Sequence, residues 1–128
     1  MDANVIKVLK ENLWYLGTYS DEPNAVPVAF KDVTDDGVLL VGDVFLDQTL
    51  KNIEANGKIC VSTCDAQTME GYQIKGSAEY LSEGEIVDTF KKAVEEMFNG
   101  AATAKGALKI TAEKIIVTTP GPDNKKVL

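Results

Sequence analysis

Turn-forming residues interrupt this sequence every eight to fifteen residues, and the stretches between them are short and apolar. Within several of these stretches apolar and polar residues alternate, which is typical of a strand that buries one face. No internal repeat or low-complexity tract breaks the pattern. The sequence therefore predicts a mainly β chain, an antiparallel barrel or sandwich accompanied by a few helices.

The expected elements follow from the period of the apolar residues. Strands are predicted at residues 14–20, 25–33, 38–44, 58–64 and 71–82, the first three forming a meander, and residues 108–111 and 114–119 form one closing strand or two. Apolar residues spaced by three and four predict helices within residues 2–13, 47–57 and 83–99. Asp2 and Asp47 stand where the side chain of an N-cap would lie. Pro27 cannot donate a ladder hydrogen bond, so its strand is expected at an edge or a bulge.

Length and hydropathy limit the organisation of the chain. Its 128 residues, 45% of them hydrophobic, predict a single domain over residues 1–128. No apolar run approaches the roughly 20 residues of a membrane span. The N-terminal residues mix Asp, Asn and Lys among aliphatic residues, unlike a signal peptide. We therefore expect a cytoplasmic protein with no membrane partner.

The charged residues exclude several classes of function. A net charge of −7 without clustered lysines argues against a nucleic-acid partner. The chain has no His and no Arg, and all thirteen basic residues are Lys. Catalysis by Ser-His or Cys-His pairs, metal sites with His ligands and bidentate Arg clamps are therefore excluded. We expect no metal site and identify no catalytic side chain.

The segment 47–52, DQTLKN, combines several features that favour an anion. The start of a helix presents unpaired backbone N–H groups and a partial positive charge. Gln48 and Thr49 add side-chain donors in its first turn, and Lys51 adds a full charge nearby. The same pattern also occurs where a helix simply begins at the surface with solvated residues, so the local sequence leaves both interpretations open.

Four segments together resemble the FMN-binding split-barrel family, which includes the pyridoxamine 5'-phosphate oxidase-like proteins and small bacterial FMN-binding proteins. They are NAVPVAF (24–30), DGVLLVGD (36–43), QTLKNIEANGKICVS (48–62) and GYQIKGSAEYL (71–81). The resemblance implies a six-stranded antiparallel split β-barrel with flanking helices. It also implies a homodimer that binds FMN at the subunit interface.

Carried over position by position, the resemblance implies a set of cofactor-binding residues. It places phosphate ligands at Gln48 and Thr49 with Lys51 nearby. The isoalloxazine would lie against strand backbone, which is expected at Pro27, Val28, Ala29, Val41 and Gly42. Gln48 departs from the family, which has Arg or Lys at its position, and a neutral donor forgoes a charge-assisted bond of about 1.5 to 3 kcal/mol.

The function that the resemblance implies is an FMN-dependent oxidoreductase or electron carrier, with a small molecule as electron donor or acceptor. The protein would supply position and solvent exclusion while the flavin supplies the redox chemistry. The Arg and His residues by which pyridoxamine phosphate oxidases grip their substrate are absent, which argues against that substrate. The alternatives are a module that stores flavin or deazaflavin without turnover, and a split barrel that has lost its ligand.

Overall fold

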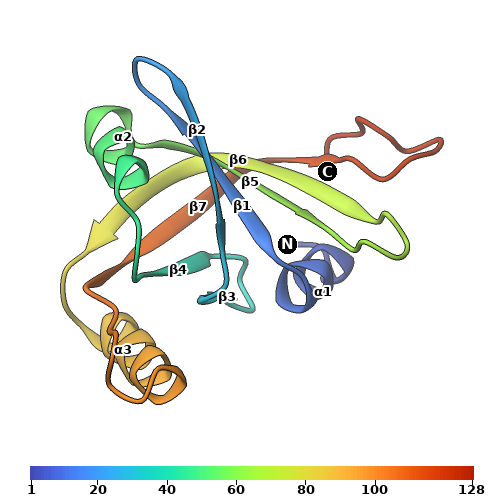
Figure 1. Ribbon diagram of the computed structural model, residues 1–128. Helices are drawn as coiled ribbons and strands as arrows, with labels where there is room; N and C mark the ends of the chain where they lie inside the picture. The colour runs from blue at the N-terminus through green and yellow to red at the C-terminus, as the bar shows by residue number, and fades with distance from the viewer.

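A computed structural model describes all residues, 1–128, and contains one seven-stranded antiparallel sheet and three helices (Figure 1). The strands are β1 (Trp14–Tyr19), β2 (Pro23–Val28), β3 (Lys31–Val33), β4 (Leu39–Asp43), β5 (Lys58–Cys64), β6 (Gly71–Leu81) and β7 (Gly106–Val117). The helices are α1 (Ala3–Glu11), α2 (Gln48–Asn56) and α3 (Glu85–Met97). The order across the sheet is β2-β1-β5-β6-β7-β4-β3.

The sheet curls on itself because its two edges are joined by a short connection. β2 is one edge and β3 is the other, yet only Ala29 and Phe30 separate them in the chain. The end of β2 must therefore lie beside the start of β3, and a hydrogen bond from the Gly42 N–H to the Phe30 carbonyl (2.9 Å) ties this seam to β4. The result is an incompletely hydrogen-bonded barrel, and its seam is where the candidate site lies.

Two apolar clusters fill the fold, one on each face of β4. Seventeen buried residues form the main core inside the curled sheet, and Leu39 and Val41 extend into it from β4. On the opposite face, Leu40 and Val44 pack with Phe90 of α3 in a second cluster of seven buried residues. Figure 1 shows α3 at one end of the molecule, away from α1. The alternation along β4 thus joins the barrel to α3.

The mainly β antiparallel architecture confirms the expected fold class, with two differences in detail. The expected six strands are seven, because the predicted strand 25–33 is divided into β2 and β3 at the seam. The expected meander is therefore interrupted at the seam, where β2 pairs with β1 and β3 pairs with β4. Pro27 does lie on an edge strand, and the Asp2 side chain caps α1 by accepting from the Asn4 N–H (2.9 Å).

Candidate functional site

A cavity of about 520 Å³ opens along the seam of the barrel. The β2 edge and the connection to β3 form one wall, the end of β4 and the loop after it form the other, and α2 begins at one end. Six of the eight expected cofactor-binding residues line it, namely Pro27, Val28, Ala29, Gly42, Gln48 and Thr49. Residues from three stretches of the sequence, 24–30, 42–49 and Phe98, are thus brought to one cavity.

The polar end of the cavity is built by side-chain hydrogen bonds between α2 and the β1–β2 hairpin. Asn24 donates to the Thr49 hydroxyl oxygen (3.1 Å), and Asn52 donates to the Thr18 hydroxyl oxygen (3.0 Å). Gln48 donates to the Asn52 side-chain oxygen (2.9 Å). Because Thr49 and Asn52 are buried, these bonds are shielded from water and hold the first turn of α2 in place. Asn24 and Asn52 were not predicted as site residues from the sequence, although Asn52 lies four residues after Gln48 on the same helix face.

Donors remain free at this polar end. The backbone N–H groups of Gln48 and Thr49 make no hydrogen bond within the protein, as expected for the first turn of a helix. The Thr49 oxygen is an acceptor in its bond with Asn24, so its own O–H group is still available to donate. An anion at this end would therefore meet two backbone N–H groups and a hydroxyl.

Two expected site residues do not line the cavity. The Val41 side chain is fully buried in the main core, on the opposite face of β4 from Gly42. Lys51 lies on the exposed side of α2, where its Nζ is 3.6 Å from the Asp47 carboxylate. Asp47 occupies the N-cap position of α2, as predicted, but its carboxylate makes no capping hydrogen bond. Among the lining residues Asp47 alone is charged, and no lysine contributes.

The wall at Gly42 has a specific packing requirement. A Cβ atom at this position would lie 2.9 Å from the Phe90 ring of α3, too close for any side chain. A glycine inside a strand often marks a bulge or the close approach of another group. The structure shows that the protein's own Phe90 ring makes such an approach on one side.

A buried carboxylate lies directly behind this wall. Asp43 is 1% exposed, and one of its oxygens accepts a hydrogen bond from the Tyr80 hydroxyl (2.8 Å) while the other has no partner. Burial raises the pKa of the Tyr80 phenol to about 12, and the Asp43 carboxylate acts in the same direction. Asp43 separates two residues of the cavity wall, Gly42 and Val44, so its contacts help fix that wall.

Two large aromatic residues, Trp14 and Tyr72, lie in the main core and not in the cavity. Trp14 donates its indole N–H to the Leu9 carbonyl (2.7 Å), and the Lys31 ammonium lies 5.1 Å above its ring. No group of three or more acidic, Cys or His side chains is placed to hold a metal ion. None of the helices has the length and apolar character needed to cross a membrane.

Comparison with known proteins agrees with this geometry. The family model described as pyridoxamine 5'-phosphate oxidase matches residues 3–120. Uncharacterized protein MJ0282 of Methanocaldococcus jannaschii is 32% identical, over the whole of this chain and 87% of its own. The structure of HupZ from Group A Streptococcus superposes with a TM-score of 0.82 at 25% identity, covering 96% of this chain and 98% of HupZ.

An FMN-binding protein from Syntrophomonas wolfei shares the fold at 18% identity, with a TM-score of 0.79 over 92% of this chain and 86% of that protein. The curled sheet and its seam therefore define a split-barrel fold. The chain belongs to the pyridoxamine 5'-phosphate oxidase family. This family assignment confirms the resemblance seen in the sequence.

Proposed function

We propose that this protein is an FMN-binding flavoprotein that acts as an oxidoreductase or electron carrier. The observation that carries the proposal is the polarity of the seam cavity. Its α2 end offers unpaired N–H groups and a hydroxyl, while eight of its fourteen lining residues are hydrophobic. A ligand with an anionic end and a flat apolar end matches this arrangement.

The residues present fit FMN, with neutral donors in place of a cation. The Gln48 and Thr49 N–H groups and the Thr49 hydroxyl would hold the phosphate, and the backbone from Pro27 to Ala29 would border the ring. The flavin supplies hydride and electron transfer when it is bound. The chain itself positions the ring, excludes water with the apolar wall, and keeps the α2 turn rigid through the buried network that Asn52 completes.

We do not propose pyridoxamine phosphate as the substrate of this protein, although the family is named after it. A phosphorylated substrate beside the flavin would need its own charge-assisted contacts, for which Arg and Lys are the usual donors. The chain has no Arg or His, and no lysine lines the cavity. We infer a different electron donor or acceptor.

The cofactor is tested by titrating the purified protein with FMN and with riboflavin while flavin fluorescence is measured. FMN should bind and give the protein a flavin absorption spectrum. Riboflavin should bind more weakly because it lacks the phosphate. A protein that takes up neither flavin contradicts the proposal. Steady-state turnover of the holoprotein with an added electron donor and acceptor then separates an enzyme from a storage module, which should show none.

Because no cation lines the cavity, adding one at position 48 should strengthen FMN binding. Gln48→Lys should tighten FMN binding about tenfold, since a charge-assisted bond contributes roughly 1.5 to 3 kcal/mol and part of it is lost to solvent. Riboflavin binding should stay unchanged in the same variant, which serves as the matched control. Equal changes for both flavins would show that the phosphate lies elsewhere.

A further inference from the structure

Three phenylalanine rings lie together in the wall of the cavity, and we name them the aromatic triad: Phe30, Phe45 and Phe98. The Phe30 and Phe98 ring centroids are 6.0 Å apart at an interplanar angle of 51°. Phe45 meets Phe98 edge to face, at 6.4 Å and 79°. All three residues line the cavity. Rings set at such angles leave a corner in which another flat ring can stack on one member and meet the edge of another.

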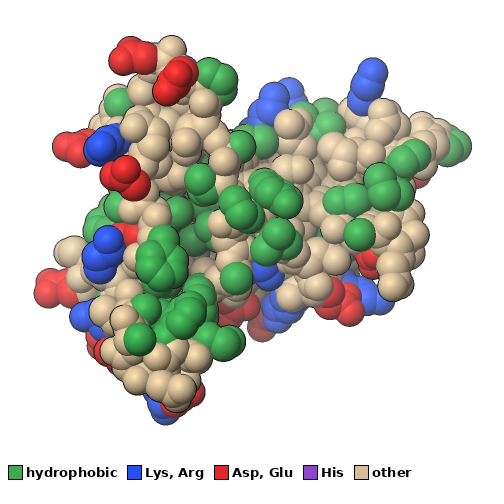
Figure 2. Space-filling view, viewed as in Figure 1, with side chains coloured by type: hydrophobic (Ala, Val, Ile, Leu, Met, Phe, Trp, Pro, Cys, Tyr) green, Lys and Arg blue, Asp and Glu red, His purple; other side chains and the backbone are tan.

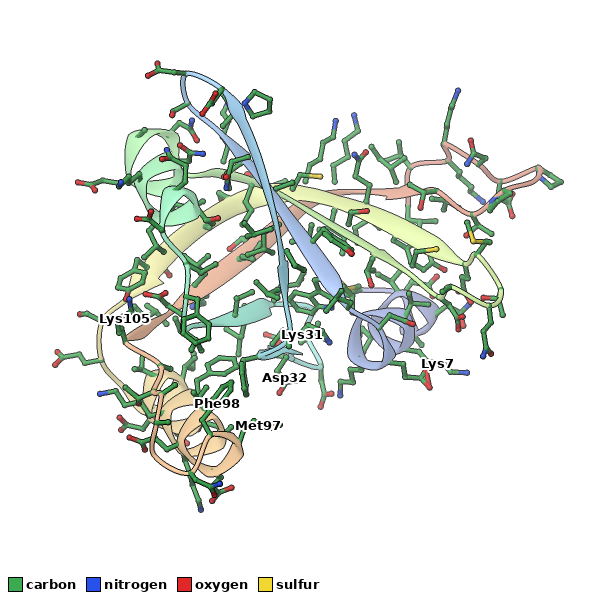
Figure 3. The ribbon with its side chains drawn as sticks, viewed as in Figure 1. Lys7, Lys31, Asp32, Met97, Phe98 and Lys105 are labelled. Carbon is green, nitrogen blue, oxygen red and sulfur yellow. The ribbon has the colours of Figure 1, made fainter.

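Two of the three rings in the triad are exposed to solvent. Phe45 is 78% exposed and Phe98 is 38% exposed, although each is a large apolar side chain. Figure 2 shows hydrophobic side chains gathered over α3 and the adjoining sheet, and Figure 3 places Phe98 where α3 faces the sheet. Neither exposed ring belongs to the buried clusters, so the two do little to hold the fold together. An exposed apolar patch beside a cavity indicates a binding surface.

The charges around the cavity limit what can bind there. No lysine lines the cavity, and its free donors lie at the α2 end. A dinucleotide, with its two phosphates, would find no cation at the triad, and the chain as a whole carries a net charge of −7. An uncharged ring compound meets no such penalty and covers the exposed rings.

We propose that the aromatic triad binds the second substrate of the flavin, and that this substrate is an uncharged, planar electron acceptor of the quinone class. The inference rests on the proposed function, because it needs FMN in the same cavity. When bound and reduced, FMN would supply a hydride, that is two electrons and one proton, and would itself become oxidised. The quinone held by the triad would take a second proton from solvent and leave as the hydroquinone.

The experiment measures the re-oxidation of the flavin without air. The FMN holoprotein is reduced with dithionite and mixed with naphthoquinone or with ferricyanide, a charged, non-planar oxidant, and flavin absorbance is followed. Wild-type protein should show saturation with naphthoquinone. Phe45→Leu and Phe98→Leu, which keep an apolar side chain but lose the ring, should raise the half-saturating concentration about tenfold. Their rates with ferricyanide should stay unchanged.

Met97→Leu is the matched control, because Met97 adjoins Phe98 and is 67% exposed but does not line the cavity. It should behave as wild type with both oxidants. The inference is overturned if both Phe variants keep wild-type saturation, or if they lose FMN or change oligomeric state, which would make the triad a cofactor or subunit contact. A protein that binds no flavin fails at the earlier FMN titration, so failure of the proposed function is recognised separately.

Discussion

At the scale of single residues, the contact between Asp43 and Tyr80 joins the cavity wall to the longest pair of strands. The Asp43 carboxylate is buried and has the Tyr80 hydroxyl as its one side-chain partner. The Tyr80 ring can reach it because Gly106 has no side chain, since a Cβ atom there would overlap the phenol. The sequence alone does not show the contact between Asp43 and Tyr80, because these two residues lie 37 positions apart.

Tyr80→Phe should lower the free energy of unfolding by about 1 to 3 kcal/mol, because it leaves both oxygens of a buried carboxylate without a partner. Urea unfolding followed by circular dichroism measures this change. Tyr19→Phe removes the same atom from a hydroxyl that bonds to no protein group and should change the stability by less than about 0.5 kcal/mol. Equal effects of the two substitutions would show that the Asp43 contact contributes nothing.

Tyr72 makes the stability depend on alkaline pH. Burial raises the pKa of this phenol to about 12, and the Glu70 carboxylate, which accepts its hydroxyl (2.7 Å), acts in the same direction. The folded protein therefore keeps a proton that the unfolded chain loses above pH 10. This contribution is fully present below pH 10 and is lost as the pH rises through about 12.

Between these pH values the stability of the wild-type protein should fall more steeply than that of Tyr72→Phe. The difference in slope should reach at most about 1.4 kcal/mol per pH unit, the value for one proton. Urea unfolding at a series of alkaline pH values measures both slopes, and the lysines titrate in both proteins. Parallel slopes would mean that Tyr72 ionises equally in the folded and unfolded chains.

At the scale of elements, α2 is held by side chains from another part of the sheet. Asn52→Ala removes two hydrogen bonds, the one that Asn52 accepts from Gln48 and the one that it donates to Thr18. Asn52 has no exposed surface, so water cannot replace these bonds. It should destabilise the protein by about 1 to 3 kcal/mol and weaken FMN binding, because the α2 turn is no longer fixed. Urea unfolding and FMN titration measure the two effects. Glu54→Ala, on the exposed side of the same helix, should change neither the stability nor the FMN affinity. If Asn52→Ala lowers the stability but leaves the FMN affinity unchanged, Asn52 does not position the FMN site.

The elements that the sequence predicted well are those with a long, regular period. The alternation at 58–64 and 71–82 matches β5 and β6, and the helical spacing after residue 83 matches α3. Residues 25–33 also alternate, but the chain changes partner strand at Ala29 and Phe30, and a period of two carries no information about partners. In the same way, Gln48 and Thr49 were found from the helix start, whereas Asn24 belongs to the site through a tertiary contact only.

At the scale of the whole molecule, the outer face of the β1–β2 hairpin is left without a covering layer. Its cross-strand pairs are Tyr15 with Pro27, Gly17 with Ala25, and Tyr19 with Pro23. None of these residues is charged, and both tyrosines are about half exposed, at 50% and 49%. An uncharged strip of this kind is typical of a subunit contact. Pro27 belongs both to this strip and to the seam cavity, so a subunit packed here would reach the cofactor.

We therefore expect a homodimer that forms through this strip, and Ala25→Lys should make it monomeric. In a two-fold symmetric contact each substitution appears twice, so two lysine charges would be desolvated in every dimer. Light scattering after size-exclusion chromatography measures the mass, and Ala55→Lys, an exposed position on α2, is the control that should remain dimeric. Because Pro27 links the strip to the cavity, the monomeric variant should also bind FMN more weakly. A monomer with unchanged FMN affinity would show that one chain completes the flavin site alone, and an Ala25→Lys dimer would place the contact on another face.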